Sequence, residues 1–488
     1  MDRRTFLGTA FGSAAAWSLA GRGAGEGGSA SSRPNVIMIS VEDMAPLLGC
    51  YGHPSAKTPH IDRLGKRGAV FLNAHCQKAL CNPSRAAVLT GLRPPNTGVY
   101  GNHQDWRARM PDGHRTLPEW FQDHGYQTVS CGKITHGEGQ FREIEPEHTA
   151  REKAMWTRYL PYRAERPRIK PNRPAAPLPD MLESGDYIDR STEWGPSGLA
   201  PEEQRDGAIA EAVAAFLDQP GTQPFFLAAG FYTPHYSLRA PKPFFDLHDP
   251  DDMVLPDSPA DDLADVPATF SPFNRADEVW LTEREKREVL AAYHACISYV
   301  DHCVGRVLDA LDASGRAEDT IVCLWGDHGM HMGEHGLWRK ATMFECATRV
   351  PFLFAGPRIR RRSAGCLQPA ELIDIFPTLA ELCRLPEPPG LEAVSMAPIL
   401  ADPGRSWKKA AFTYNRPDHL TLRTERFRYT ENGSPERAEL YDHRKDPGEH
   451  RNVADVPDYA ETRTRLAALM RDGWKAALPA GMRQRKGH

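Results

Sequence analysis

Long apolar segments are scarce in this sequence of 488 residues, and beyond position 20 none has the length of a membrane-spanning helix. Charge of one sign is scarce too. The formal net charge is −4, and Lys and Arg are spread along the chain rather than gathered in a block, so no nucleic-acid partner is expected. An anionic ligand therefore has to be bound by a local group of side chains.

Internal repeats are absent, and so is any calcium loop of the usual pattern. Segment 249–267 is rich in Asp and Pro but lacks the spacing and the glycine of such a loop, so we interpret it as solvated and irregular. Segment 161–179 is Pro-rich and basic. Both segments are predicted to be irregular insertions.

The first 32 residues have the composition of a targeting segment. Arg3 and Arg4 precede Phe6-Leu7, a weakly apolar Gly/Ala-rich stretch and a Gly/Ser-rich run. This order resembles a twin-arginine export signal. A membrane anchor is the alternative, but the apolar stretch is short and rich in Gly and Ala. We predict that residues 1–32 are a signal and linker read by export machinery, with no stable anchor, and that the protein is periplasmic or extracellular.

The remaining chain has the pattern of an α/β fold with a large core and a second, smaller domain. Short apolar runs alternate with helical patterns, which predicts a mainly parallel sheet with helices on both faces. The expected strands are 36–40, 128–131, 225–229, 321–325 and 350–354, and the expected helices are 59–66, 117–124, 208–217, 281–313 and 371–383.

A boundary is predicted within 384–406. Beyond it, short antiparallel strands are expected at 412–414, 420–424, 427–429 and 440–441, followed by a helix at about 459–478. We therefore divide the chain into a catalytic domain, 33–395, and a C-terminal α+β subdomain, 396–488.

Cys81 occupies an unusual position. It precedes Asn82-Pro83-Ser84-Arg85 and the run that ends at Thr90, and Pro and Ser are helix-start signals. A side chain there lies near the positive end of a helix, which favours an anion. The alternative is a buried structural cysteine, a common role for an unpaired thiol.

Four expected strands end in polar residues. These residues are Glu42 and Asp43, Lys133 and His136, His235, and Asp327 and His328. The carboxyl ends of parallel strands share one edge, where such folds bind ligands. Residues almost three hundred positions apart are therefore expected to meet.

The acids among these residues predict a metal site. Three clustered carboxylates repel one another strongly unless a cation lies between them. Oxygen ligands favour Ca²⁺ or Mg²⁺ over zinc, and His328 leaves room for Mn²⁺ or Zn²⁺. A single Asp after a strand is more often a cap or a turn residue, but an acidic pair and an Asp-His pair together favour a metal.

The cations Arg85, Lys133 and Lys340, with His136 and His235, could bind a tetrahedral anion or its monoester. A lone Lys is usually solvated and a lone His usually structural. These five lie instead at strand ends, in the Cys81 motif or after the Asp327 motif.

Taken together, the motifs resemble the type I formylglycine-dependent sulfatases of the alkaline phosphatase-like superfamily, and above all the branch of iduronate-2-sulfatase and its bacterial relatives. The resemblance covers 35 to about 454. Its motifs are Cys-x-Pro-Ser-Arg with Leu-Thr-Gly, Thr58-Pro59-His60, Lys133-x-x-His136, Thr233-Pro234-His235, Asp327-His328-Gly329 and Trp338-x-Lys340.

The resemblance implies the chemistry of each site residue. A maturase would oxidise Cys81 to formylglycine, whose hydrate attacks sulfur. One Ca²⁺, in preference to Mg²⁺ or Mn²⁺, would be held at Glu42, Asp43, Asp327, His328 and position 81. Arg85 and Lys133 would steady the nucleophile and His136 would act as base. His235 and Lys340 would bind sulfate, with His235 as proton donor to the leaving alcohol.

Two residues depart from the family pattern. Glu42 stands where the family usually has Asp, which puts its metal ligation in question, and Leu92 stands where an Arg commonly follows Leu-Thr-Gly. The chain has ten cysteines, so conversion of Cys81 would leave an odd number and exclude a complete disulfide framework. Most of the others lie in apolar runs and are predicted to be core residues.

The resulting hypothesis is an exported sulfatase acting on sulfated polysaccharide or oligosaccharide. One alternative is a phosphate or phosphonate monoester hydrolase, because the fold and metal site also serve phosphoryl transfer. Another is a sulfated-glycan binding protein with an unconverted Cys81. The sequence leaves open the sugar, the sulfate position, exo or endo action, the signal cleavage site and the oligomeric state.

Overall fold

The computed structural model describes residues 33–136, 146–174, 192–267, 281–360, 365–479 and 482. The predicted signal and linker, 1–32, lies outside the described residues, as do positions 175–179 of the basic segment. Over the part that is described, no helix is both long and apolar enough to cross a bilayer.

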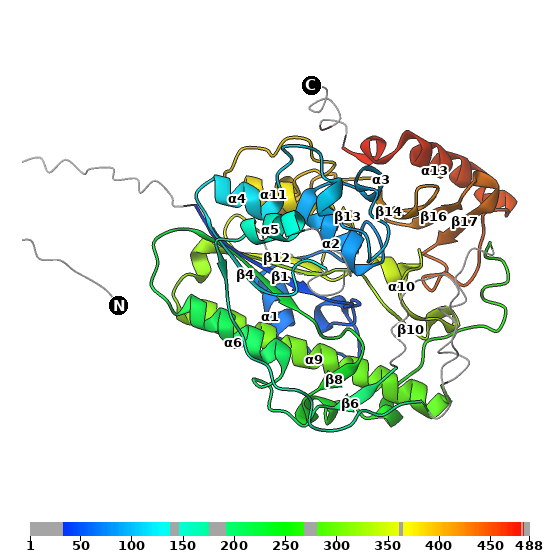
Figure 1. Ribbon diagram of the computed structural model, residues 1–488. Helices are drawn as coiled ribbons and strands as arrows, with labels where there is room; N and C mark the ends of the chain where they lie inside the picture. The colour runs from blue at the N-terminus through cyan, green and yellow to red at the C-terminus, as the bar shows by residue number, and fades with distance from the viewer. Residues whose placement is uncertain are drawn as a thin grey trace, which may run out of the picture. The chain divides into compact units, whose positions relative to one another are not determined.

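A seven-stranded sheet forms the centre of the fold (Figure 1). Its strand order is β2 (Gly68–Val70), β12 (Phe352–Ala355), β9 (Thr320–Gly326), β1 (Asn35–Val41), β7 (Phe225–Phe231), β4 (Gln127–Gly132) and β5 (Arg158–Tyr159). Strands β9, β1, β7 and β4 are adjacent and parallel, with Ile37 level with Val322 on one side and Leu227 on the other. The four strands that carry the predicted site residues therefore share one carboxyl edge.

The sheet departs from a fully parallel arrangement at one side. Strand β12 was expected as 350–354, but it begins at Phe352 and runs antiparallel to both β9 and β2. The connection from β9 to β12 contains no long crossover helix, and a parallel pair needs such a crossover. The mainly parallel α/β sheet that the sequence predicts is nevertheless confirmed.

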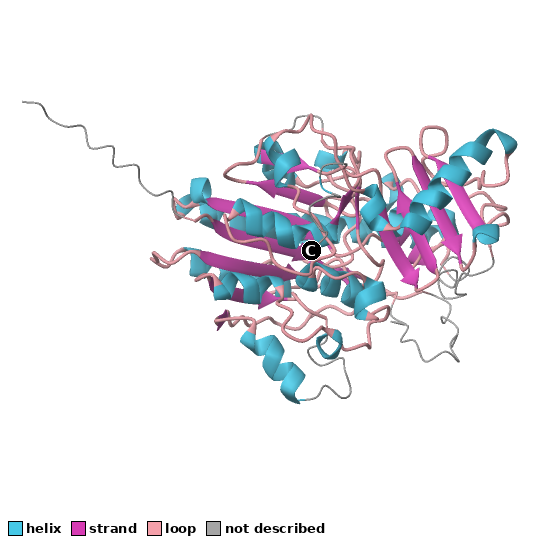
Figure 2. Ribbon diagram, turned by 90° about the horizontal axis from the view of Figure 1, so that it is seen from above, coloured by secondary structure: helices cyan, strands magenta, loops and turns pink. Residues whose placement is uncertain are grey.

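Helices cover both faces of this sheet, as Figure 2 shows. Ile37, Ile39 and Val41 of β1 pack on one side with α1 (Pro59–Arg67), α6 (Arg205–Leu217) and α9 (Glu283–Ala313). Val36 and Met38 pack on the other side with α2 (Cys81–Thr90), α4 (Leu117–Asp123) and α11 (Ile375–Leu382). This alternation is expected of a strand buried on both faces. The shorter helices are α3 (Pro94–Thr97), α5 (Pro146–Ala154), α7 (Lys242–Phe245), α10 (Glu345–Thr348) and α12 (Ala397–Ala401).

A second, antiparallel sheet follows. It consists of β14 (Ala411–Arg416), β15 (His419–Arg423), β16 (Phe427–Asn432) and β17 (Ala438–Asp442), and α13 (Ala460–Asp472) packs on it. The predicted small C-terminal sheet is thus confirmed. Three two-stranded ribbons complete the described structure: β3 (Ala74–His75) with β13 (Ala370–Glu371), β6 (Trp194–Pro196) with β8 (Leu238–Ala240), and β10 (His331–Met332) with β11 (Trp338–Arg339).

The helix expected at 371–383 begins later than its pattern suggests. Glu371 belongs to β13, and a 3₁₀ turn over Leu372–Asp374 precedes α11. Arg93 and Lys408 both pair with the buried Glu371 carboxylate. These tertiary contacts hold residue 371 in an extended conformation, so local pattern could not locate the helix start.

Candidate active site

The structure brings the predicted site residues together at the carboxyl edge of the central sheet. Glu42 and Asp43 follow β1, Lys133 follows β4, and Asp327 and His328 follow β9. His235 lies in the turn after β7. Arg85 lies on α2 and Lys340 directly follows β11.

Cys81 begins α2 and is completely buried. Its Sγ lies 3.1 Å from Lys340 Nζ, 3.2 Å from His328 Nε2 and 3.5 Å from Asp43 Oδ1. Burial raises the pKa of the thiol, so an unmodified Cys81 is a weak nucleophile here.

Asp43 and Asp327 are linked through the backbone. The Asp43 N–H donates to Asp327 Oδ1 at 2.9 Å, and Arg85 Nε donates to Asp327 Oδ2 at 2.8 Å. His328 Nε2 lies 3.0 Å from Asp43 Oδ1. Ligand atoms of Asp43, Cys81, Asp327 and His328 all lie within 4.8 Å of one another, close enough to surround one ion.

Glu42 belongs to a second, overlapping group with Asp43, Cys81 and His235. Its carboxylate is paired with Lys133, and Oε1 lies 3.8 Å from His235 Nε2. Burial favours the neutral acid, but Lys133 and His235 outweigh it and hold the pKa of Glu42 below its usual value. Glu42 is therefore a carboxylate facing the site, one methylene longer than the family's Asp.

Asp43 is ionised for a similar reason. Burial alone would raise its pKa, but Lys340, His235 and His328 hold the pKa well below the usual value. His328 Nδ1 is 2.8 Å from Gly329 O, so Nδ1 donates there and Nε2 faces Asp43. Carboxylate oxygens with one oriented imidazole suit a hard divalent cation, so the residues present fit the metal that the family implies.

Cations line the same centre. Lys340 Nζ lies 2.7 Å from both Asp43 oxygens, and this pairing raises the pKa of Lys340 despite its burial. Arg85 Nη1 donates to Lys133 O at 2.6 Å, while Arg85 Nη2 is buried without a hydrogen-bond partner among the described residues. A buried guanidinium nitrogen left unpaired is a donor available to an anion.

The two histidines outside the metal-ligand group differ in environment. Burial and the nearby Lys133 lower the pKa of His136 to about 2, so His136 is a neutral imidazole. His235 leaves 30% of its side chain exposed. Its Nδ1 lies 2.7 Å from Tyr236 O, and its Nε2 faces Glu42 and Asp43. His235 therefore lies where a substrate entering from solvent would meet it.

Sequence reasoning missed two supporting residues. The hydroxyl of Tyr293 on α9 donates to Asp43 O at 2.6 Å and accepts from the Ala45 N–H at 2.8 Å. It thereby holds Asp43, whose φ of 53° is unusual for a residue other than glycine. The carboxylate of Asp206 accepts from the N–H groups of Tyr232 and Thr233, at the turn that carries His235. Tyr293 matches the apolar stripe of its helix, so no sequence signal distinguished it from a core residue.

We predict that Tyr293→Phe weakens metal binding about tenfold. The change keeps the ring but leaves a buried C=O and N–H unsatisfied, which costs about 1–3 kcal/mol at the metal-binding turn. Tyr299→Phe is a matched control, because its hydroxyl makes the same pair of bonds on the same helix, to Pro201 O and the Gly207 N–H. Metal titration should separate the two variants even where thermal unfolding does not. Equal metal affinities would show that Tyr293 has only a structural role.

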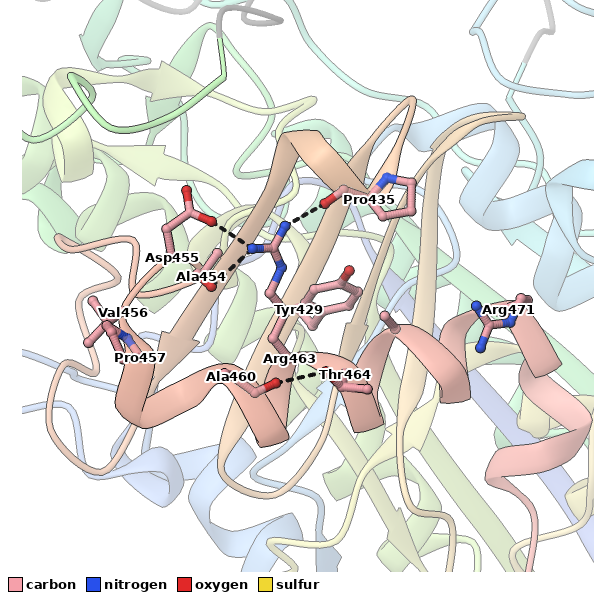
Figure 3. Close-up of a pocket in the computed structure, with 11 residues that line it drawn as sticks. Tyr429, Pro435, Ala454, Asp455, Val456, Pro457, Ala460, Arg463, Thr464 and Arg471 are labelled. Carbon is pink, nitrogen blue, oxygen red and sulfur yellow. Dashed lines mark hydrogen bonds and ion pairs between the residues drawn. The ribbon is translucent and has the colours of Figure 1, made fainter.

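A pocket of about 450 Å³ lies elsewhere, between β16 and α13 (Figure 3). Arg463 crosses it, pairing with Asp455 at 2.6 Å and donating to Pro435 O at 2.8 Å. None of the predicted site residues lines this pocket, so it is separate from the candidate active site.

The mainly parallel sheet, with acids, cations and a helix-start cysteine at its carboxyl edge, has the alkaline phosphatase-like fold, which solved sulfatases share. The chain belongs to the sulfatase family, whose model matches residues 34–384. A second model, N-sulphoglucosamine sulphohydrolase, C-terminal, matches 333–475. The protein is therefore a sulfuric ester hydrolase, which confirms the resemblance found in its motifs.

Individual relatives agree with this assignment. A sulfatase from Formosa agariphila is 32% identical over 90% of this chain and 86% of its own. Iduronate 2-sulfatase from Homo sapiens is 30% identical over 77% of this chain and 73% of its own. The solved phosphonate monoester hydrolase of Agrobacterium radiobacter, 22% identical, superposes with a TM-score of 0.72 over 90% of this chain and 95% of its own, a likeness of fold alone.

Proposed function

We propose that this protein removes sulfate from sulfated polysaccharide or oligosaccharide, using formylglycine at position 81 and one divalent ion, Ca²⁺. The convergence of Asp43, His328 and Lys340 on Cys81 Sγ carries this proposal. The similarity to iduronate 2-sulfatase supports a sulfated sugar as substrate. We also infer export, from the arginine pair at the N-terminus, and maturation by a formylglycine-generating enzyme.

The divalent ion would supply positive charge, and the modified residue at position 81 would supply the nucleophile. Glu42, Asp43, Asp327 and His328 would hold the ion, which neutralises charge on the sulfate oxygens. The hydrate of formylglycine at position 81 would supply a hydroxyl where a buried thiol is a poor nucleophile.

Anion binding and proton transfer are assigned to side chains of this protein. Arg85 fixes Asp327 and has Nη2 available for an anion. Lys340 keeps a positive charge beside position 81. His136, the base that the family resemblance implies, is neutral because it is buried beside Lys133, the form that a base must have before it takes up a proton. His235 at the open side can donate one to the departing alcohol.

We predict that His235→Ala slows a sugar sulfate at least about a hundredfold, but an aryl sulfate with a good leaving group far less. A sugar alkoxide needs a proton to leave, whereas a nitrophenolate does not. Lys340→Ala is the comparison variant and should slow both, because it removes charge beside position 81. The measurement is kcat/KM over a leaving-group series. Equal losses across that series would leave His235 as a sulfate ligand rather than the acid.

The second candidate function is that of a phosphate or phosphonate monoester hydrolase. The observation that supports it is the fold shared with the phosphonate monoester hydrolase of Agrobacterium radiobacter. Matched nitrophenyl sulfate, phosphate and phosphonate esters decide between the two. We expect kcat/KM to be highest for the sulfate, and a higher value for either phosphorus ester would overturn the proposal. Glycan binding without turnover, with only thiol at position 81 after expression with a maturase, would instead favour a non-catalytic binding protein.

A further inference from the structure

The described part of the basic segment, 161–174, is rich in positively charged residues. None of these residues is among the predicted active-site residues. The segment contains five cations and one acid, Glu165. All five cations are exposed. Arg168 pairs with Glu203 and Arg173 pairs with Glu193. The other three, at 163, 166 and 170, have no carboxylate in ion-pair contact within the described structure.

The backbone of this segment is held in place although it forms no long helix or strand. The N–H of Glu165 donates to Glu203 O at 2.8 Å, that of Arg168 to Ser197 O at 2.7 Å, and that of Asn172 to Trp194 O at 2.8 Å. The cations at 163, 166 and 170 are therefore presented from a fixed chain. Their spacing of three and four residues separates the Cα atoms of neighbouring cations by at most about 10 to 14 Å.

Contacts connect the segment to the candidate active site. The Tyr162 side chain interacts with that of Tyr232, and Lys133 Nζ lies 5.8 Å from the centre of the Tyr232 ring. Further along the segment, Asn172 bridges to Trp194 of β6. Strand β6 in turn pairs with β8, which begins shortly after the His235 turn (Figure 1). The exposed charges thus begin next to a tyrosine that contacts Tyr232, three residues before His235 in the chain.

We propose that Arg163, Arg166 and Lys170 form a strip that binds an extended sulfated polysaccharide chain while one of its sulfate esters occupies the active site. This rests on the proposed function and adds that the substrate is a polymer. Exposed, unpaired cations attract a polyanion through displacement of its counterions. The formal charge of the whole chain is −4, so attraction of a polyanion requires a local concentration of positive charge such as this strip.

The test is a triple variant, Arg163→Gln, Arg166→Gln and Lys170→Gln, of the full chain. Heparin is the sulfated polysaccharide probe, dextran the uncharged control and single-stranded DNA the alternative polyanion. We expect the Kd for heparin to rise about tenfold at ~0.1 M salt, with a shallower salt dependence. Hydrolysis of an aryl sulfate should be unchanged, because none of the three residues contacts the site.

A matched variant, Arg465→Gln, Arg471→Gln and Lys475→Gln, removes the same charge from α13 and the turn after it. In Figure 1, α13 is at the opposite end of the picture from β6 and β8. Equal weakening by both variants, no weakening by the strip variant, or tighter binding of DNA than of heparin would overturn the proposal. Heparin binding requires no turnover, so absent sulfatase activity would count against the proposed function alone.

Discussion

Cys81→Ala should abolish hydrolysis of an aryl sulfate, with kcat falling by more than about 10⁴-fold, as expected when a nucleophile is removed. Lys340, His328 and Asp43 all contact the side chain at position 81. Alanine is smaller and uncharged, so the fold should survive. Steady-state kinetics with circular dichroism would measure both effects.

The matched control for this variant is Cys50→Ala. Cys50 is half-buried next to α1, away from the site residues, and its removal should change the rate less than about twofold. Peptide mass spectrometry of protein produced with a maturase should find formylglycine at 81. A Cys81→Ala enzyme that keeps its rate, or a fully active enzyme carrying only thiol, would exclude the proposed nucleophile.

Asp327→Ala should lose turnover and metal together. Asp327 accepts hydrogen bonds from the N–H groups of Asp43 and His328 and pairs with Arg85. Without it, the buried Arg85 guanidinium loses its ion pair, which costs about 3–5 kcal/mol. Asp327→Asn keeps the shape of the side chain and tests the metal if the Ala variant unfolds. Elemental analysis, thermal unfolding and aryl sulfate turnover are the measurements.

Asp301→Asn is the control for the two Asp327 variants. Asp301 is also a buried Asp that accepts from two backbone N–H groups, those of His60 and Ile61, so it should lower stability but leave the metal content unchanged. Chelation of the native enzyme should abolish turnover, and Ca²⁺ should restore it. Full activity after exhaustive chelation, with no divalent ion in the pure protein, would refute the metal site.

Much of the fold could be predicted because the spacing of apolar residues along the chain matches the positions that are buried in the folded protein. The apolar run at Val36 to Ser40 has few stable alternatives to a buried central strand, and the stripe at 281–313 is a helix over Glu283–Ala313. Prediction failed where long-range pairing overrode local pattern. Glu371 is extended because Arg93 and Lys408 hold it, and β12 is antiparallel because no long crossover helix connects it to β9.

The residue types at the strand ends and at the start of α2 could be assigned without a structure, because those identities follow directly from the order of the chain. How these residues meet depends on the folded arrangement. In the folded chain Glu42 pairs with Lys133, and Asp43 pairs with Lys340. The hydroxyl of Tyr293, 250 positions away, donates to Asp43 O. Such contacts depend on strand order and helix packing, which bring together side chains that no local pattern relates.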